Sequence, residues 1–133
     1  WLPAGLPLDR ITADIVHLRQ LCTNAGRDFS EIAIAPQYIA LVDHNHDRAV
    51  ARFTSSQMHK HLVSLTQSTL KEQAGISMAD ANLVGTPAEV VEKARALKAV
   101  GVTHLLGLYF AVNTAEELLD QMTLFAEEVA PRL

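Results

Sequence analysis

Residues Leu83–Phe110, LVGTPAEVVEKARALKAVGVTHLLGLYF, predict a helix followed directly by a buried strand. Thr86 can cap the helix, and Pro87 occupies its first position. Glu89, three residues after Thr86, completes a capping box that satisfies free N–H groups of the first turn. Gly101 then ends the helix, where a left-handed residue is favoured. The apolar stripe of this helix is Val90, Val91, Ala94, Leu97 and Val100.

Two segments have the apolar pattern of strands covered by helices. Residues 105–108, Leu-Leu-Gly-Leu, are apolar on both faces, as in a parallel sheet. Ile32–Val42, IAIAPQYIALV, is the second strand, and Pro36 predicts a bulge or break midway because it lacks a ladder donor. With the flanking helices, these strands predict an α/β fold with parallel strands and covering helices.

The rest of the chain predicts further helices and irregular connections. Trp1–Pro7 is expected to be a loop, and a helix should run from Leu8 to near Gly26. Another helix should begin at about Asp47 and carry Ala49, Val50, Phe53 and Met58, and a short one should lie near Leu65–Glu72. A closing helix with the stripe Leu118, Met122, Phe125 and Val129 should begin at a second capping box, formed by Thr114 and Glu117.

The order of these segments resembles the C-terminal end of the bacterial-luciferase-like monooxygenases. The matching segments are V-G-T-P at 84–87, A-V-G-V-T-H-L-L-G-L at 99–108 and F-A-E-E-V-A-P-R-L at 125–133. Gly26-Arg27-Asp28 and Trp1-Leu2-Pro3 resemble two other parts of the family. The resemblance implies a (β/α)8 barrel that uses a reduced flavin or deazaflavin, FMN or its deaza analogue, on a small organic substrate.

The chain is short for such a barrel. It has 133 residues and begins with Trp1, whereas a (β/α)8 barrel typically needs about 250 residues. We therefore expect residues 1–133 to be one domain or part of a domain, the C-terminal half of a luciferase-like barrel. Half a barrel should leave one apolar sheet face bare, so the expected partners are the missing N-terminal half or copies of the chain in a homo-oligomer.

Composition excludes several other classes of partner. The formal net charge is −4 and no basic patch with interleaved aromatic residues is present, which argues against nucleic acid. No apolar run is long enough to cross a bilayer, and no leader pattern opens the chain. Cys22 stands alone on an apolar stripe, as expected for a buried reduced thiol in a cytoplasmic protein.

Candidate pocket residues lie where the predicted strands end, because barrel chemistry gathers there. They are Gln37, Tyr38, His44, Gly107 and Tyr109. Gly107 could let a flat ring approach the backbone, or it could serve close helix packing.

No metal site or catalytic residue is predicted. His44 and His46 could supply two imidazoles, but no third ligand lies at a suitable spacing, so a solvated loop that caps the next helix is favoured. The resemblance implies that the flavin ring and phosphate are held mostly by the half of the barrel absent from these residues. We therefore expect this chain alone to bind no cofactor and to be inactive, with a non-catalytic, self-assembling half-barrel module as the alternative.

Overall fold

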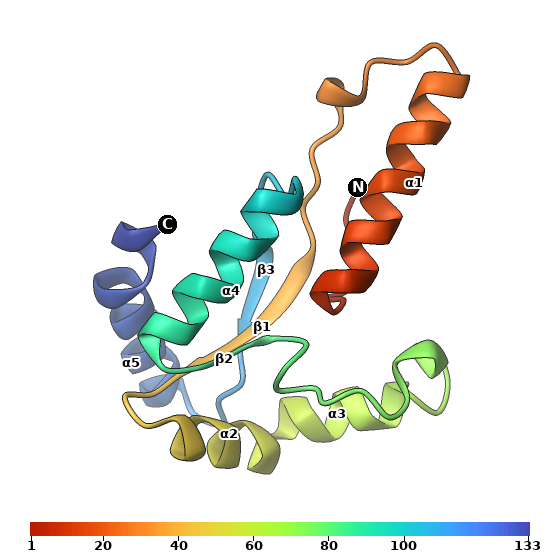
Figure 1. Cartoon of the computed structure of the whole chain (residues 1–133). Coiled ribbons are helices and arrows are strands. Elements are labelled where there is room, and N and C mark those ends of the chain that lie inside the picture. The colour runs from red at the N-terminus through yellow and green to blue at the C-terminus, as the bar shows by residue number, and fades with distance from the viewer.

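The computed structural model describes the backbone of residues 1–133 and every side chain except those of Glu72 and residues 106–108. The strands are β1 (Gln37–Val42), β2 (Leu83–Gly85) and β3 (Leu106–Phe110). The helices are α1 (Leu8–Asn24), α2 (His46–Ser55), α3 (Gln57–Leu65), α4 (Pro87–Val100) and α5 (Ala115–Glu128), as drawn in Figure 1.

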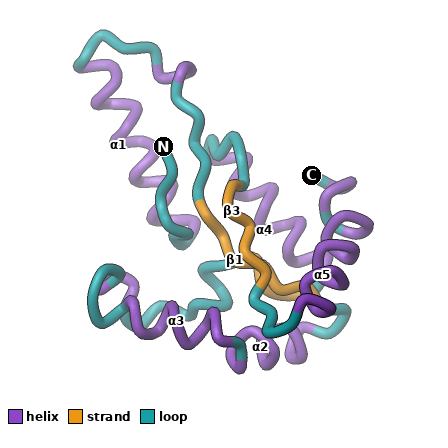
Figure 2. The backbone as a smooth tube through the Cα atoms, turned by 180° about the vertical axis from the view of Figure 1, so that it is seen from behind, coloured by secondary structure: helices purple, strands orange, loops and turns teal.

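The three strands form a parallel sheet in the order β2-β1-β3. Ala40 lies beside Leu83 on one side of β1, and Ile39 lies beside Tyr109 on the other side. The register shifts between Gln37 and Ile39, close to the proline that was predicted to disturb the strand. Figure 2 shows β1 and β3 running side by side.

The N-terminal segment, which was expected to be a loop, continues the β2 side of the sheet. Ala4 bridges Gln37 in parallel, and the Gln37 N–H donates to the Pro3 carbonyl at 2.9 Å. Because Gln37 also pairs with β3, this segment lies on the opposite edge of β1. The segment and β2 thus lie on one side of β1, and β3 lies on the other side.

Helices cover both faces of the sheet. On one face, α1, α4 and α5 pack against alternate β1 residues such as Tyr38 and Ala40. On the other face, Ile39 and Leu41 pack with Phe53 of α2, and Leu62 of α3 joins this cluster. The expectation that one face is bare is therefore wrong, because the 46–82 connection folds back over it (Figure 1).

Local capping in the central helix is as predicted. The Glu89 N–H donates to Thr86 Oγ1, and the Thr86 N–H donates to Glu89 Oε2 at 2.7 Å. Gly101 adopts a φ of 112° and ends α4. Within the next strand, the surroundings of Gly107 lie outside the described side chains, so the structure does not choose between its two predicted roles.

Several predicted boundaries move for local reasons. Regular pairing in the second candidate strand starts at Gln37, directly after Pro36. The helix expected from Asp47 is divided at Ser56, whose hydroxyl accepts from the His59 N–H at 3.1 Å and starts α3. A short helix near Leu65–Glu72 is wrong in extent, because α3 already ends at Leu65 and a 3-10 turn follows at Lys71–Gln73.

The face that α5 buries agrees with the predicted stripe only at its C-terminal end, where Val129 is fully buried and Phe125 packs against the core. Leu118 is 37% and Met122 50% exposed, whereas Gln121 is only 2% exposed. The Gln121 amide accepts from the Val42 N–H at 2.7 Å and donates to the Val42 carbonyl at 2.8 Å. The side chain thereby pairs with both backbone groups of Val42, as a neighbouring strand would. Because buried backbone groups need hydrogen-bond partners, the polar Gln121 faces the sheet although the apolar pattern predicts Leu118 and Met122 there.

The second capping box is only half formed. The Glu117 N–H donates to Thr114 Oγ1 at 3.2 Å, but the Glu117 carboxylate accepts from the Asn113 N–H instead of the Thr114 N–H.

Among the helices described, none is long and apolar enough to cross a membrane.

Candidate functional site

A cavity of about 340 Å³ lies between the sheet and α3, and we call it the α3 cavity. Its floor is formed by Gln37 and Ile39 of β1 and Tyr109 of β3, and α3 contributes Met58 and Leu62 to its wall. The other lining residues are Ala4, Gly5, His61, Leu65, Leu70, Gln73 and Asn82. Two of the predicted pocket residues, Gln37 and Tyr109, therefore meet at one site.

The segment that leads into β2 holds the cavity in shape. Asn82 is 7% exposed, and its side-chain carbonyl accepts from the Ile39 N–H at 3.0 Å while its amide donates to the Met78 carbonyl at 2.8 Å. The Gln73 amide donates to the Gly5 carbonyl at 3.3 Å. A Cβ at Gly5 would come within 2.8 Å of the Gln37 carbonyl oxygen, so only glycine allows this close approach.

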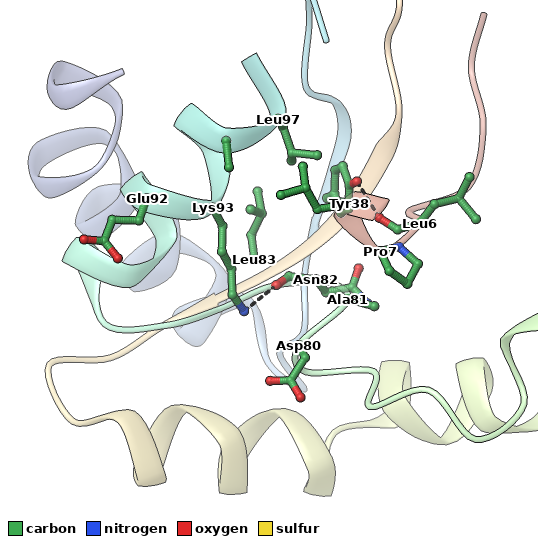
Figure 3. Close-up of a pocket in the computed structure, with 12 residues that line it drawn as sticks. Leu6, Pro7, Tyr38, Asp80, Ala81, Asn82, Leu83, Glu92, Lys93 and Leu97 are labelled. Carbon is green, nitrogen blue, oxygen red and sulfur yellow. Dashed lines mark hydrogen bonds between the residues drawn. The ribbon is translucent and has the colours of Figure 1, made fainter. Parts of the chain in front are cut away.

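Tyr38, another predicted pocket residue, faces the opposite side of the sheet. It is 2% exposed and its hydroxyl donates to the Leu6 carbonyl at 2.7 Å. Burial raises the pKa of Tyr38 to about 12. The residue lines a second cavity of about 280 Å³ between β2, α4 and the N-terminal segment, shown in Figure 3.

Lys93 closes the outer edge of β2 beside this second cavity. Its Nζ donates to the carbonyls of Ala79 at 3.1 Å, Asn82 at 2.9 Å and Val84 at 3.0 Å. Figure 3 draws the bond to Asn82. Desolvation lowers the pKa of Lys93, and the nearby Asp80 opposes that change. All three ammonium protons are used by backbone groups, so Lys93 protects a strand edge and has no proton left for a ligand.

His44, at the carboxyl end of β1, lies apart from both cavities. Its imidazole is 3.5 Å from Glu128 of α5, and His46 is 3.0 Å from Glu89 of α4. These four side chains are 42–64% exposed. Ion pairs with this exposure contribute little to stability, so the two pairs hold the β1–α2 loop to α4 and α5 only weakly. No group of three metal-binding side chains occurs in the part of the chain whose side chains are described.

Asp43 beside His44 forms the strongest charged contact of the strand ends. Its carboxylate is 6% exposed and accepts from Arg48 Nε at 2.7 and 2.8 Å and from Arg52 Nη1 at 3.3 Å. The hydrogen bonds from Arg48 lower the pKa of Asp43 to about 2. This network holds the start of α2 at the end of β1. The guanidinium groups of Arg48 and Arg52 are both engaged by the Asp43 carboxylate.

We expect Asp43 to give the protein an acid-labile contribution to stability. Its pKa is about 2 in the folded state, against 3.8 for the free side chain. The contribution is therefore complete above about pH 4 and is lost as the pH falls through about 2. Urea unfolding of the wild type and Asp43→Asn between about pH 5 and 2 measures it, because the variant lacks this titration.

In that experiment, the stability of the two proteins should converge toward the acid end. Glu89, whose pKa is lowered to about 2 chiefly by the hydrogen bond from the Thr86 N–H, titrates in both proteins and cancels in the difference. Parallel pH profiles would contradict the assignment.

The capped helix N-termini and four of the basic side chains offer no vacant donors to the phosphate of FMN. The N-termini of α2, α3, α4 and α5 are occupied by their own side-chain caps, and α1 carries Asp9 in its first turn. Arg48 and Arg52 hold Asp43, while Arg95 and Lys98 donate to the carbonyls of Arg132 and Leu133. An anion needs converging vacant donors, and these groups provide none.

Solved structures of redox enzymes match nearly the whole chain. A monooxygenase from Streptomyces bottropensis aligns with a TM-score of 0.66 at 20% identity, over 98% of this chain and 40% of its own. The coenzyme F420-dependent tetrahydromethanopterin reductase from Methanopyrus kandleri gives 0.63 at 18% identity, over 98% and 44%. A type II Baeyer–Villiger monooxygenase from Pseudomonas putida, solved with FMN, gives 0.64 at 19% identity, over 99% and 42%.

Nearly the whole chain has the fold of about two fifths of a luciferase-like barrel. This confirms the predicted fold class and the resemblance at the level of fold. It also explains why α1, α4 and α5 share one face, because helices lie on the outside of such barrels. The α3 cavity is consequently on the lumenal face of the luciferase-like sheet.

Sequence comparison gives a different relationship. No family model matches the chain. Proline–tRNA ligases from two strains of Treponema pallidum are 28% identical over 130 residues. That match covers 95% of this chain but only 20% of each ligase, so the chain spans about a fifth of these curated relatives. The structural matches carry more weight, because several separately solved enzymes agree on one fold over nearly the whole chain.

Sequence reasoning missed α3, Gln73 and Asn82 as parts of the site. A weak signal existed for Asn82, because it directly precedes the apolar pair Leu83-Val84 that forms β2. The α3 residues gave no such signal, since their contact with the sheet depends on how the 46–82 connection folds back.

Proposed function

We propose that this chain is the C-terminal part of a flavin- or deazaflavin-dependent oxidoreductase or monooxygenase that acts on a small organic substrate. The observation that carries the proposal is the fold match over 98% of this chain to about two fifths of enzymes described as monooxygenases and F420-dependent reductases. In such enzymes the cofactor performs the redox step, and the protein orients the substrate and excludes water. This part would supply the α3 cavity as one wall of the substrate pocket.

The reading frame that encodes residues 1–133, expressed with all of its upstream sequence, tests the proposal. We expect the product to bind FMN or F420 and to oxidise the reduced cofactor in the presence of oxygen or a substrate. A full-length product that binds neither cofactor would refute the proposed function.

For residues 1–133 alone we predict no FMN or F420 binding at micromolar concentrations. The reason is that the capped N-termini of α2 to α5 and the engaged side chains of Arg48, Arg52, Arg95 and Lys98 offer a phosphate no vacant donors. Titration followed by flavin fluorescence measures the affinity, with a flavodoxin as the positive control. A Kd at or below about 10 μM would show that these residues contain a cofactor site that the geometry does not reveal.

The alternative is a non-catalytic half-barrel module that assembles with itself or with another chain. It is favoured by the apolar surface on α5, where Leu119 is 64% and Met122 50% exposed, next to the β3 side of the sheet. Under this proposal the partners are copies of the chain or the rest of a barrel. Sedimentation of residues 1–133 at micromolar concentration decides the question: a stable stoichiometric oligomer supports it, and a single 14.5 kDa species excludes self-assembly.

The ligase similarity does not favour tRNA binding by these residues. Nucleic-acid-binding surfaces are rich in lysine and arginine, whereas this chain has a formal charge of −4 and an isoelectric point near 5.8.

A further inference from the structure

We infer that the α3 cavity binds an uncharged, mainly apolar small molecule whose carbonyl or hydroxyl group is held by Gln37 and Tyr109. The inference rests on the proposed function, because it names the substrate class for the same pocket.

Size and wall chemistry favour a small organic ligand. The cavity volume of about 340 Å³ lies at the lower end of the range of about 300–1,000 Å³ that is typical of small-molecule sites. Ile39 on the floor and Met58 and Leu62 on the wall are apolar, and Leu65 and Leu70 extend this surface. A ring or a short alkyl chain would replace water against these side chains.

Two polar groups in the cavity are available to a ligand. Within the described part of the chain, the Gln37 amide and the Tyr109 hydroxyl donate to no protein group, and Tyr109 is 49% exposed. Asn82 and Gln73, by contrast, have hydrogen bonds to backbone groups that maintain the fold. A ligand carbonyl or hydroxyl could therefore bond to Gln37 and Tyr109 without disturbing the protein.

The charges of the lining decide the class of ligand. None of the described side chains in the α3 cavity belongs to Asp, Glu, Lys or Arg, and His61 is exposed. The Tyr38 cavity, by comparison, contains Asp80, Glu92 and Lys93. An ionised ligand in the α3 cavity would lose hydration without gaining a countercharge. Neutral molecules are thus favoured over their carboxylate analogues.

Three probes of matched shape separate these contributions: benzylacetone, which is neutral with a carbonyl; hydrocinnamate, which is its carboxylate counterpart; and butylbenzene, which lacks a polar group. Ligand-observed NMR against the 133-residue chain measures each Kd. We expect benzylacetone to bind at least about 10-fold more tightly than hydrocinnamate. Equal or tighter binding of hydrocinnamate, or no binding of benzylacetone, would overturn the inference.

Paired variants locate the binding site. Leu62→Trp fills the cavity and should weaken benzylacetone binding at least about 10-fold, while the matched control Val63→Trp, at a site 43% exposed on the same helix, should leave it unchanged. Tyr109→Phe, which removes one surface hydroxyl and keeps the ring, should weaken benzylacetone about 3- to 10-fold and leave butylbenzene unchanged. If neither Leu62→Trp nor Tyr109→Phe changes the affinity, the ligand binds elsewhere and the inference fails.

This test is separate from that of the proposed function. Selective binding of benzylacetone by a chain whose full-length form binds no flavin would support the cavity and refute the redox role. Cofactor turnover by the full-length protein without any neutral-ligand preference in this chain would do the reverse.

Discussion

Replacing Phe53 with alanine is expected to lower the free energy of unfolding by about 3–5 kcal/mol. Phe53 is fully buried between α2 and the sheet, in a cluster with Ile39, Leu41 and Met78. Its ring also meets that of His59 edge to face, with centroids 5.2 Å apart. Truncation would remove this packing and leave a cavity at the point where the 46–82 connection is held on the sheet.

Urea denaturation followed by circular dichroism measures the loss, with Val16→Ala as the control. Val16 lies on α1 and is 65% exposed, so its truncation should change stability by no more than about 0.5 kcal/mol. A loss of less than about 1.5 kcal/mol for Phe53→Ala would show that α2 is not firmly packed on this face. The lumenal face would then be open, and the α3 cavity would lose its wall.

On the opposite face, Leu97→Ala should cost about 2–5 kcal/mol. Leu97 is 5% exposed on α4 and packs in the core that includes Ile11 and Ile15 of α1. Removing the cap of the same helix with Thr86→Ala should cost only about 1 kcal/mol, since one hydrogen-bonding partner of the first turn is lost and the apolar contacts remain.

Both variants should be measured in one denaturation series, because the rank of their losses in unfolding free energy is more informative than either loss alone. If Thr86→Ala proved more destabilising than Leu97→Ala, capping rather than burial would hold α4 in place. The packing of α1 against α4 would then contribute little.

Features that depend on neighbours in the chain could be predicted from the sequence. The capping box of Thr86 and Glu89, the left-handed Gly101 and the disturbance at Pro36 all arise between residues at most a few positions apart. The parallel α/β class follows in the same way, because an apolar run after each amphipathic helix requires a covered sheet. The order and spacing of these local segments also carried the luciferase-like resemblance.

Features that depend on register between distant segments were decided only by the tertiary structure. Gln121 is buried because it meets the free backbone of Val42, 79 positions away, and no local pattern encodes that partner. The predicted pocket residues lie at different sites for the same reason. Alternation along β1 sends Gln37 and Tyr38 to opposite faces, so only Gln37 meets Tyr109, and His44 lies at the strand end. The sequence determined which residues form strands and helices, whereas pairing and packing across the sheet determined which side chains share a cavity.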